Sequence, residues 1–333
     1  MSVEGPAQVV VVGPVNMDLF MRGSAPLERT ALNQWVGPSD VQLIVAGSIG
    51  YTIQALARLG CQVEVCTAIG DDAFGSHIRR ELEAAGIGTG YSVTGHGETA
   101  IALYMLLFGG SKRPMTYRFP GFEPWPDPLP EFGGPDSSVE LLHCGGLLHF
   151  PAMWGRSLAA RFATARQRGV LTSLDPQFPL IDTPAPWLSH IADVLAETDV
   201  LLCDEGEASQ IFSVDSVTVA LARAREAGPR IVAIKRGAAG CLVTDGRRIV
   251  RQPAIGVPDE LVREAVGAGD AFDAGFLDAL LRGADLDDAA RFATATAALS
   301  LRARGGAEGI ADRAAVLAAL TEVPPAVVDV ARS

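Results

Sequence analysis

From residue 141 onward, short apolar runs of strand length alternate with segments of helical length. The apolar runs are Leu141–Phe150, Val170–Leu174, Val200–Leu202 and Ile231–Ile234. The helical segments that separate them are Arg156–Arg168, Trp187–Ala196 and Ser216–Ala227. Strands that alternate with helices are typical of a mostly parallel sheet with helices on both faces. The sequence therefore predicts an α/β fold built on a doubly wound sheet.

The N-terminal part of the chain extends this alternation. We predict strands at Val9–Val12 and Val63–Ala68, because both segments are rich in valine. A helix between them closes at Leu59-Gly60. A second helix covers Asp71–Ala85, with one of its first two aspartates near the N-cap.

One region does not fit the alternation and predicts a small separate sheet. Thr99–Leu107 and Met115–Phe119 are rich in β-forming residues and are joined by a glycine-containing turn at 109–112, as in a hairpin. With Leu32–Trp35 and Val41–Val45 they can form a small antiparallel sheet beside the core. The following proline-rich stretch, 119–135, is expected on the surface.

Composition excludes several classes of partner. The chain has 27 lysines and arginines against 39 aspartates and glutamates, a net charge of −12. Without a long basic run, we expect neither nucleic acid nor an anionic membrane surface as a partner. No apolar stretch reaches the ~18–20 residues of a bilayer-spanning helix, and the first eight residues carry no basic segment of a signal peptide. We expect a soluble, cytoplasmic protein.

Cysteines and histidines give no sign of a metal centre. The five cysteines never form a C-x-x-C pair, so we expect buried free thiols at Cys61, Cys66, Cys144, Cys203 and Cys241. No histidine pair has the H-E-x-x-H spacing, and His143 and His149 flank an apolar run, where a structural histidine is the usual interpretation. We predict no metal site made by protein side chains alone.

The strongest functional signal lies between Val266 and Phe276. Apolar residues recur every four positions from Phe272, which predicts a helix that starts near Asp270. Gly267 and Gly269 precede it, and glycines before a helix N-terminus let backbone N–H groups converge on an anion. Asp270 is then either an N-cap or a base that removes a proton from a hydroxyl attacking a phosphate.

The stretch G-A-G-D-A-F-D-A-G-F, residues 267–276, resembles the C-terminal signature of the ribokinase-like (PfkB) family of carbohydrate and nucleoside kinases. The P-loop sequence G-x-x-x-x-G-K-[ST] is absent. Five further segments resemble motifs of this family and occur in the same order along the chain. They are residues 13–18 (G-x-x-N-x-D), 46–60 (ending in A-R-L-G), 68–75 (V-G-x-D-x-F-G), 204–207 (N-x-x-E) and 235–240 (K-x-G-x-x-G). The resemblance spans residues 9 to 310.

This resemblance implies a fold and a set of site residues. The fold is a ribokinase-like doubly wound sheet with a small β lid, formed by about residues 30–46 and 97–120, within a single domain, 1–333. The implied catalytic residues are Asp270 as general base with Gly267, Ala268 and Gly269 as the anion hole. The implied nucleotide-binding residues are Lys235, Gly237, Gly240, Ala268 and Gly269, with the adenine beside the predicted helix through 293–301. The implied acceptor-binding residues are Asn16, Asp18, Gly47, Tyr51 and Arg118.

The resemblance also implies ATP and Mg²⁺, with Glu207 holding the metal through water. It leaves a monovalent cation open as a further cofactor, and it implies a homodimer that forms through the β lid. Lys112 and Arg113 make the lid basic near Arg118, which fits either a solvated hairpin face or a clamp for an anionic acceptor. The dipeptide Tyr117-Arg118 is similar to a sequence feature of ketodeoxygluconate kinases.

The sequence departs from the family pattern mainly where substrates are held. Tyr51 stands at the usual position of a sugar-binding asparagine, and Ala46 replaces a glycine. The segment 264–266 is E-A-V where the family has D-T-T, Asp204 replaces the asparagine of N-x-x-E, and 175–177 is D-P-Q without the arginine that often follows D-P-N. The base, the anion hole and Glu207 are retained.

Two classes of function follow. The first is an ATP-dependent kinase that phosphorylates a hydroxyl of a small sugar or sugar acid, with a nucleoside kinase as the alternative. The second is a catalytically silent protein of the same fold that binds a ligand or partner.

Overall fold

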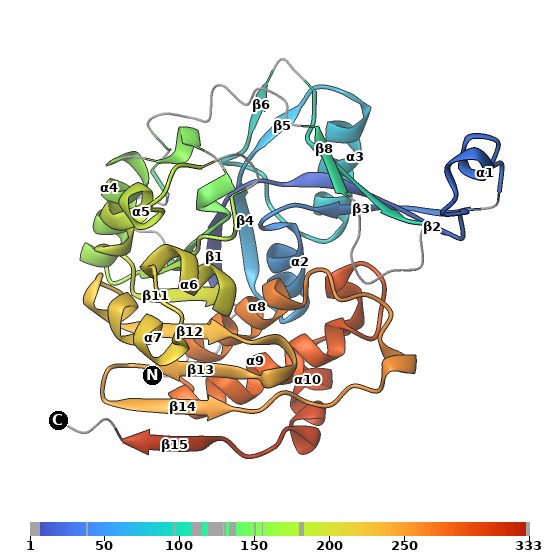
Figure 1. Cartoon of the computed structure of the whole chain (residues 1–333). Coiled ribbons are helices and arrows are strands. Elements are labelled where there is room, and N and C mark those ends of the chain that lie inside the picture. Colours follow the sequence, from blue (N-terminus) through green and yellow to red (C-terminus); the bar gives the residue numbers. More distant parts are fainter. Residues whose placement is uncertain are drawn as a thin grey trace.

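The computed structural model describes residues 7–37, 39–95, 98–107, 115–118, 129, 131–132, 138–149, 151–154, 156–179 and 183–330. A nine-stranded sheet with helices on both faces forms its centre, and a four-stranded sheet lies beside it (Figure 1). A short parallel pair, β5 (Ala68–Gly70) and β6 (Val93–Gly95), is separate from both. The predicted doubly wound α/β fold is confirmed.

The central sheet has a parallel part and an antiparallel edge. In sheet order its strands are β4 (Gln62–Cys66), β1 (Gln8–Val12), β9 (Val139–Gly145), β10 (Leu171–Asp175), β11 (Val200–Asp204), β12 (Ile231–Lys235), β13 (Cys241–Thr244), β14 (Arg248–Gln252) and β15 (Val327–Val330). The strands from β4 to β12 are parallel, and the pairs from β12 to β15 are antiparallel. The carboxyl ends of the parallel strands therefore share one edge, where α/β enzymes bind their ligands.

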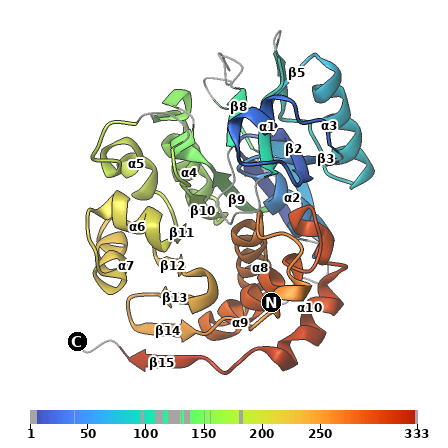
Figure 2. The same cartoon turned by 45° about the vertical axis from the view of Figure 1, so that its right-hand side comes forward.

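Helices cover both faces of this sheet (Figures 1 and 2). One face carries α2 (Gly50–Arg58), α3 (Ala73–Ala84), α8 (Ala268–Leu281), α9 (Leu286–Ser300) and α10 (Arg313–Ala319). The other carries α4 (Arg156–Gln167), α5 (Leu188–Leu195), α6 (Glu205–Phe212) and α7 (Val217–Glu226). Strand β1 shows the cause, because Val9 and Val11 pack in the first core while Val10 and Val12 pack in the second.

The second sheet, which we call the lid sheet, consists of β3 (Ser39–Ala46), β2 (Asn16–Gly23), β7 (Ile101–Leu106) and β8 (Met115–Arg118) in that order. The predicted hairpin is confirmed, because β7 and β8 pair antiparallel. Its turn, with Lys112 and Arg113, lies outside the described residues. The lid sheet has a small core of its own formed by Phe20, Ile44, Ala46 and Tyr51.

Two details of the predicted lid are wrong. Leu32–Trp35 is not a strand, because the short helix α1 (Arg29–Asn33) forms there after Glu28, whose carboxylate accepts a hydrogen bond from the Ala31 N–H at 2.8 Å. The sheet is also not wholly antiparallel. Strand β2, which the sequence analysis did not identify, pairs parallel with β7.

One predicted boundary is also wrong, and another is shifted by two residues. The predicted strand Leu141–Phe150 ends at Gly145, because Gly146 takes a φ of +73° and a 3₁₀ turn follows at Leu147–His149. Helix α8 begins at Ala268, before the predicted start near Asp270. Its N-cap is Gly267, so Asp270 lies in the first turn and is not the cap.

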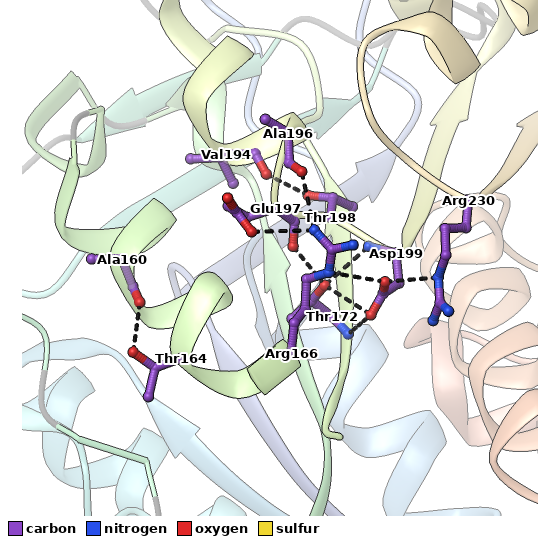
Figure 3. Close-up of polar contacts among 10 residues, drawn as sticks. All are labelled: Ala160, Thr164, Arg166, Thr172, Val194, Ala196, Glu197, Thr198, Asp199 and Arg230. Atoms are coloured by element: carbon purple, nitrogen blue, oxygen red, sulfur yellow. Dashed lines mark hydrogen bonds and ion pairs between the residues drawn. The ribbon is translucent and has the colours of Figure 1, made fainter. Parts of the chain in front are cut away.

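At the amino-terminal edge of the parallel strands, a buried carboxylate ties several elements together (Figure 3). Asp199 Oδ1 accepts from Arg166 Nε on α4 at 3.2 Å and pairs with Arg230 Nε, before β12, at 2.9 Å. Its Oδ2 accepts from the backbone N–H of Thr172 in β10 at 3.1 Å. Two guanidinium groups therefore match this one buried charge.

All five cysteines are buried with free thiols, as predicted. Their exposed fractions lie between 0% and 8%. Burial raises the pKa of the Cys61, Cys66 and Cys241 thiols to about 12. At neutral pH these side chains are protonated and serve as small apolar core residues.

Candidate active site

A cavity of about 1050 Å³ lies between the carboxyl ends of the parallel strands and the lid sheet. Eleven of the predicted site residues line it, namely Asn16, Asp18, Gly47, Tyr51, Glu207, Lys235, Gly237, Gly240, Ala268, Gly269 and Asp270. Gly267 directly precedes this wall, at the N-cap of α8. The backbone of Arg118 ends β8, opposite Ile101, and its side chain lies outside the described part.

The turn before α8 exposes backbone donors to the cavity. Gly267 has a φ of +84°, a conformation that L-residues rarely adopt, and a Cβ at this position would lie 2.8 Å from the Tyr51 ring. Ala268 and Gly269 follow in the first helical turn, where N–H groups have no partner within the helix. The Ala268 N–H makes a long hydrogen bond of 3.4 Å to the Ala265 carbonyl before the helix. Such a turn can bind an anion. We call residues 267–269 the anion turn.

Asp270 lies beside the anion turn and is half-buried. Its Oδ1 accepts a hydrogen bond from Thr52 Oγ1 of α2 at 3.1 Å. Burial raises the pKa of Asp270 to about 7, the nearby charge of Asp175 adds to the rise, and Lys235 opposes it. A helix N-terminus favours the ionised carboxylate, but desolvation has the larger effect here. A carboxyl group with this pKa can accept or donate a proton at neutral pH.

Lys235 lies below the anion turn in a tight ionic cluster. Its Nζ is 3.0 Å from Asp175 Oδ2 and 2.8 Å from Asp273 Oδ2. Burial alone would lower the pKa of Lys235, but Asp175 and Asp273 raise it well above its ordinary value. A Cβ added at Gly269 would lie 3.6 Å from Nζ. The lysine therefore packs under the glycine with its charge already matched by two carboxylates.

Glu207 occupies the first turn of α6 at the end of β11. Its Oε2 accepts from the Asp204 N–H at 2.7 Å, while Asp204 Oδ1 accepts from the Glu207 N–H at 2.7 Å. This reciprocal capping box explains why an aspartate can replace the family asparagine at 204. Burial, followed by the charge of Asp175, raises the pKa of Glu207 to about 8.

Asp18 lies at the lid end of the cavity. Its Oδ1 accepts from Asn16 Nδ2 at 2.7 Å, and its Oδ2 accepts from the Tyr51 hydroxyl at 3.1 Å. Burial raises the pKa of Asp18 to about 7, although both hydrogen bonds lower it. Gly47, with a φ of +100°, leaves room for Asn16, since a Cβ there would lie 2.6 Å from its Oδ1. These contacts orient the Asp18 carboxylate.

Tyr51 takes part in this arrangement through both its hydroxyl and its ring. The hydroxyl is bonded to Asp18, and the ring packs against Gly267 and Gly306, where added Cβ atoms would lie 2.8 and 2.4 Å from it. Only 4% of the residue is exposed. Tyr51 therefore links the Asp18 carboxylate to the anion turn and offers little ring surface for stacking.

Several residues that line this cavity or contact its lining residues were given no role from the sequence. Asp273 lies one helical turn after Asp270 on α8, a spacing that places both on one face. Asp175 ends β10 at the ligand-binding edge, a position that is itself a signal. Thr52 and Tyr104 carry no such signal, because their roles depend on how α2 and the lid sheet pack together.

The opposite end of the cavity is apolar. It lies between the turn after β12 and helix α9, and is lined by Ala238, Ile255, Val257, Ala297 and Leu301. This slot lies where the sequence analysis expected the adenine. Thus the cavity has an apolar end, a central anion turn and a hydrogen-bonding end beneath the lid.

Comparison with known proteins agrees with this arrangement. The profile of the pfkB family carbohydrate kinases matches residues 6–313. The chain belongs to the pfkB family. This pfkB-family protein is accordingly an ATP-dependent carbohydrate kinase.

Individual relatives differ in their substrates. Ribokinase of Arabidopsis thaliana is 25% identical to this pfkB-family kinase over 329 residues, 93% of this chain and 80% of that protein. A 2-dehydro-3-deoxygluconokinase of Dickeya dadantii is 36% identical over 115 residues, 34% of this chain and 37% of that protein. A putative ribokinase II from E. coli in complex with ATP and Mg²⁺ has the same fold, with a TM-score of 0.77, 19% identity and coverage of 95% of this chain and 99% of that one.

Two further findings concern metals and membranes. Within the described ranges, no group of three or more histidine, cysteine, aspartate or glutamate side chains is arranged to hold a metal ion. Among the helices of the same residues, none is long and apolar enough to cross a membrane.

Proposed function

We propose that this kinase transfers the γ-phosphoryl group of ATP to a hydroxyl group of a small sugar, with Asp270 as the general base. The observation that carries the proposal is the position of Asp270. It adjoins the anion turn and lines the same cavity as the acceptor carboxylate of Asp18. A pKa of about 7 suits a group that must take up a proton at neutral pH.

In this mechanism each residue has a separate task. Thr52 holds Oδ1 of Asp270, so Oδ2 takes the proton from the acceptor hydroxyl as it attacks. The N–H groups of Ala268 and Gly269 stabilise the charge that develops on the phosphoryl group. Asp18 and Asn16 orient the acceptor through its hydroxyl groups.

We place ATP along the cavity, with its adenine in the apolar slot and its phosphates at the anion turn. Lys235 was expected to bind the nucleotide directly. Because Asp175 and Asp273 already match its charge, we infer that it supports the anion turn from below.

The residues present fit Mg²⁺ held through water. Mg²⁺ keeps several waters and uses one or two carboxylates together with substrate phosphates. Glu207 and Asp204 line the cavity on the side of Lys235, so they can accept hydrogen bonds from these waters. Bound Mg²⁺ would offset phosphate charge during transfer. Glu207 has a pKa of about 8, so it would release a proton when the metal binds.

The charge of the cavity favours an uncharged acceptor. Five carboxylates line it, and Lys235 is the one lysine or arginine among its described lining residues. A sugar with several hydroxyl groups matches the acceptors at Asp18 and Asn16. A sugar acid would need a cation from elsewhere, for which Arg118 is the candidate.

A nucleoside is the second candidate acceptor. Tyr104 of the lid lines the cavity and stacks on Phe20, with ring centroids 4.5 Å apart. A stacked aromatic pair of this kind gives a base a flat surface to lie against.

The test is ADP release over a panel of neutral sugars, sugar acids and nucleosides with ATP and Mg²⁺, with and without K⁺. We expect turnover with a neutral sugar and a loss of ~10²–10⁴ in kcat for Asp270→Asn. The variant keeps the shape of the side chain, so its ATP affinity should change little. Near wild-type turnover by Asp270→Asn would exclude this base. A wild-type enzyme inert on every acceptor would favour the silent binder.

We also propose a homodimer through the lid. Strand β3 is an edge strand of the lid sheet, and Val41, Leu43 and Val36 are 52%, 46% and 99% exposed on or near it. An apolar edge of this kind favours pairing with a second copy. Light scattering should give twice the chain mass for wild type, and Val41→Lys together with Leu43→Lys should give a monomer.

A further inference from the structure

We propose that Arg22, on lid strand β2, holds the anion turn in its working geometry through Glu264. Arg22 would thus act as a positioning residue that couples the lid sheet to the phosphate site. The inference rests on the proposed function, because it assigns a support to the same anion turn.

The first step is an ion pair between the lid and the loop before α8. Arg22 Nη2 lies 2.8 Å from Glu264 Oε2, and the two side chains are 14% and 8% exposed. Arg22 Nη1 also donates to Gln42 Oε1 of β3 at 3.1 Å. The guanidinium is therefore oriented by two strands of the lid while it reaches the body of the protein.

Backbone hydrogen bonds connect Glu264 to the segment that leads into the anion turn. Its other oxygen, Oε1, accepts from the N–H groups of Ala265 at 3.1 Å and Val266 at 3.4 Å. These two residues immediately precede Gly267. The two carboxylate oxygens of Glu264 therefore have different partners. Oε2 binds Arg22 of the lid, and Oε1 binds the backbone that leads into the anion turn.

Contacts with aromatic rings connect Arg22 to the acceptor end of the cavity. Its guanidinium carbon lies 4.7 Å from the ring centroid of Phe20, which stacks on Tyr104, a residue that lines the cavity. Val266 packs against the same small core that contains Phe20 and Tyr51. An acceptor that contacts Tyr104 therefore touches a continuous set of contacts that ends at the anion turn.

A second ion pair between lid and body provides a matched control. Arg304, after α9, pairs with Asp40 of β3, and these side chains are 50% and 53% exposed. Exposed pairs contribute little and are screened by salt. This pair has no hydrogen bond to the residues before Gly267, so Arg304→Ala removes a link between lid and body without touching the anion turn.

The experiment measures binding of ADP and of the non-hydrolysable triphosphate AMP-PNP by calorimetry with Mg²⁺, so that its result does not depend on the acceptor. The ratio of the AMP-PNP affinity to the ADP affinity reports how strongly the protein binds the terminal phosphate. Arg22→Ala should lower AMP-PNP affinity about tenfold, as expected for loss of one charge-assisted partner, and leave ADP affinity within about twofold. Arg22→Lys should lose less, and guanidinium ion should restore part of the loss in Arg22→Ala. Arg304→Ala should keep the wild-type ratio.

If Arg22→Ala fails to fold, Glu264→Gln tests the same link. It keeps an oxygen for the two backbone N–H groups but turns an amide toward Arg22, and should reduce the ratio in the same direction. An unchanged ratio in either folded variant overturns the inference. Equal loss of both nucleotides overturns it too, because that result indicates a merely structural role. A wild type that binds ADP and AMP-PNP equally contradicts the anion turn itself, and the inference with it.

Discussion

The two edges of the parallel strands differ in how far cations match their buried carboxylates. At the amino-terminal edge, the buried carboxylate of Asp199 faces the guanidinium groups of Arg166 and Arg230, and the more exposed Glu197 shares Arg166. At the carboxyl-terminal edge, Lys235 faces both Asp175 and Asp273, and Asp270 and Glu207 lie near them. Carboxylates are matched by cations at the amino-terminal edge and are in excess at the carboxyl-terminal edge.

This difference separates a structural cluster from a functional one. Where carboxylates are in excess, burial and mutual repulsion raise the pKa of Asp270 to about 7 and of Glu207 to about 8. Carboxyl groups whose pKa is shifted this far from its ordinary value are typical of catalytic sites. The amino-terminal cluster instead joins α4, β10 and β11, and its charges are matched locally.

The largest expected effect comes from removing Lys235, the cation that is buried together with Asp175 and Asp273. Lys235→Met should lower the free energy of unfolding by ~3–5 kcal/mol, because it removes the cation from the buried Asp175 and Asp273. Adding Asp273→Asn should recover part of this loss. Urea denaturation at pH 7 measures both variants, and an unchanged midpoint for Lys235→Met would contradict the ionic cluster.

A smaller effect is expected at the opposite edge, and it should touch stability alone. Asp199→Asn should cost ~1–3 kcal/mol, because an amide cannot satisfy two guanidinium groups and the Thr172 N–H together. Turnover per folded molecule should equal that of wild type. A reduced kcat with normal folding would mean that this edge also influences the active site.

The excess of carboxylates also predicts how stability depends on pH. The pKa of Asp270 is about 7 in the folded state and 3.8 in the unfolded reference. The folded protein therefore binds the proton more tightly, so this group favours folding below pH 4 and loses that contribution as the pH rises through 7. A pKa difference of about three units corresponds to ~4 kcal/mol in the free energy of unfolding. We expect about half of this value, because the carboxylate faces the cavity.

Asp270→Asn lacks this titration. It should be more stable than wild type at pH 8 by ~2 kcal/mol, with the gap closing toward pH 4. Thermal unfolding of both proteins across this range measures the gap. A gap that is constant with pH would show that Asp270 does not titrate as its surroundings suggest.

The smallest effect concerns specificity. Tyr51→Asn removes a ring packed on Gly267 and Gly306 and replaces one hydroxyl by an amide. The order of preference over the acceptor panel should change by up to about tenfold in kcat/KM. An identical ranking would show that Tyr51 acts only through packing.

Much of this arrangement was accessible from sequence. The alternating strands and helices, the hairpin at β7 and β8 and the anion turn all rest on local patterns that the fold preserves. The strand predicted at Leu32–Trp35 was wrong because a capping carboxylate at Glu28 outweighs β propensity over so short a segment. Asp270 was correctly placed beside the anion turn, but its raised pKa was not foreseen.

The missed features share a cause. Lys235 meets Asp175 and Asp273 across 60 and 38 residues of sequence, and Arg22 meets Glu264 across 242. Their partnership is set by which strands become neighbours and by how the lid sheet lies on the body. A linear pattern contains the individual charges but not the distances between them.

The complete burial of the cysteines has a practical consequence for spectroscopy. Five protonated, enclosed thiols should react slowly with maleimide dyes, so the natural sequence already provides a quiet background. Leu27→Cys, at a position that is 80% exposed after lid strand β2, would then be labelled selectively without any other change. A single fluorophore there would report in real time how the lid responds as nucleotide and acceptor arrive.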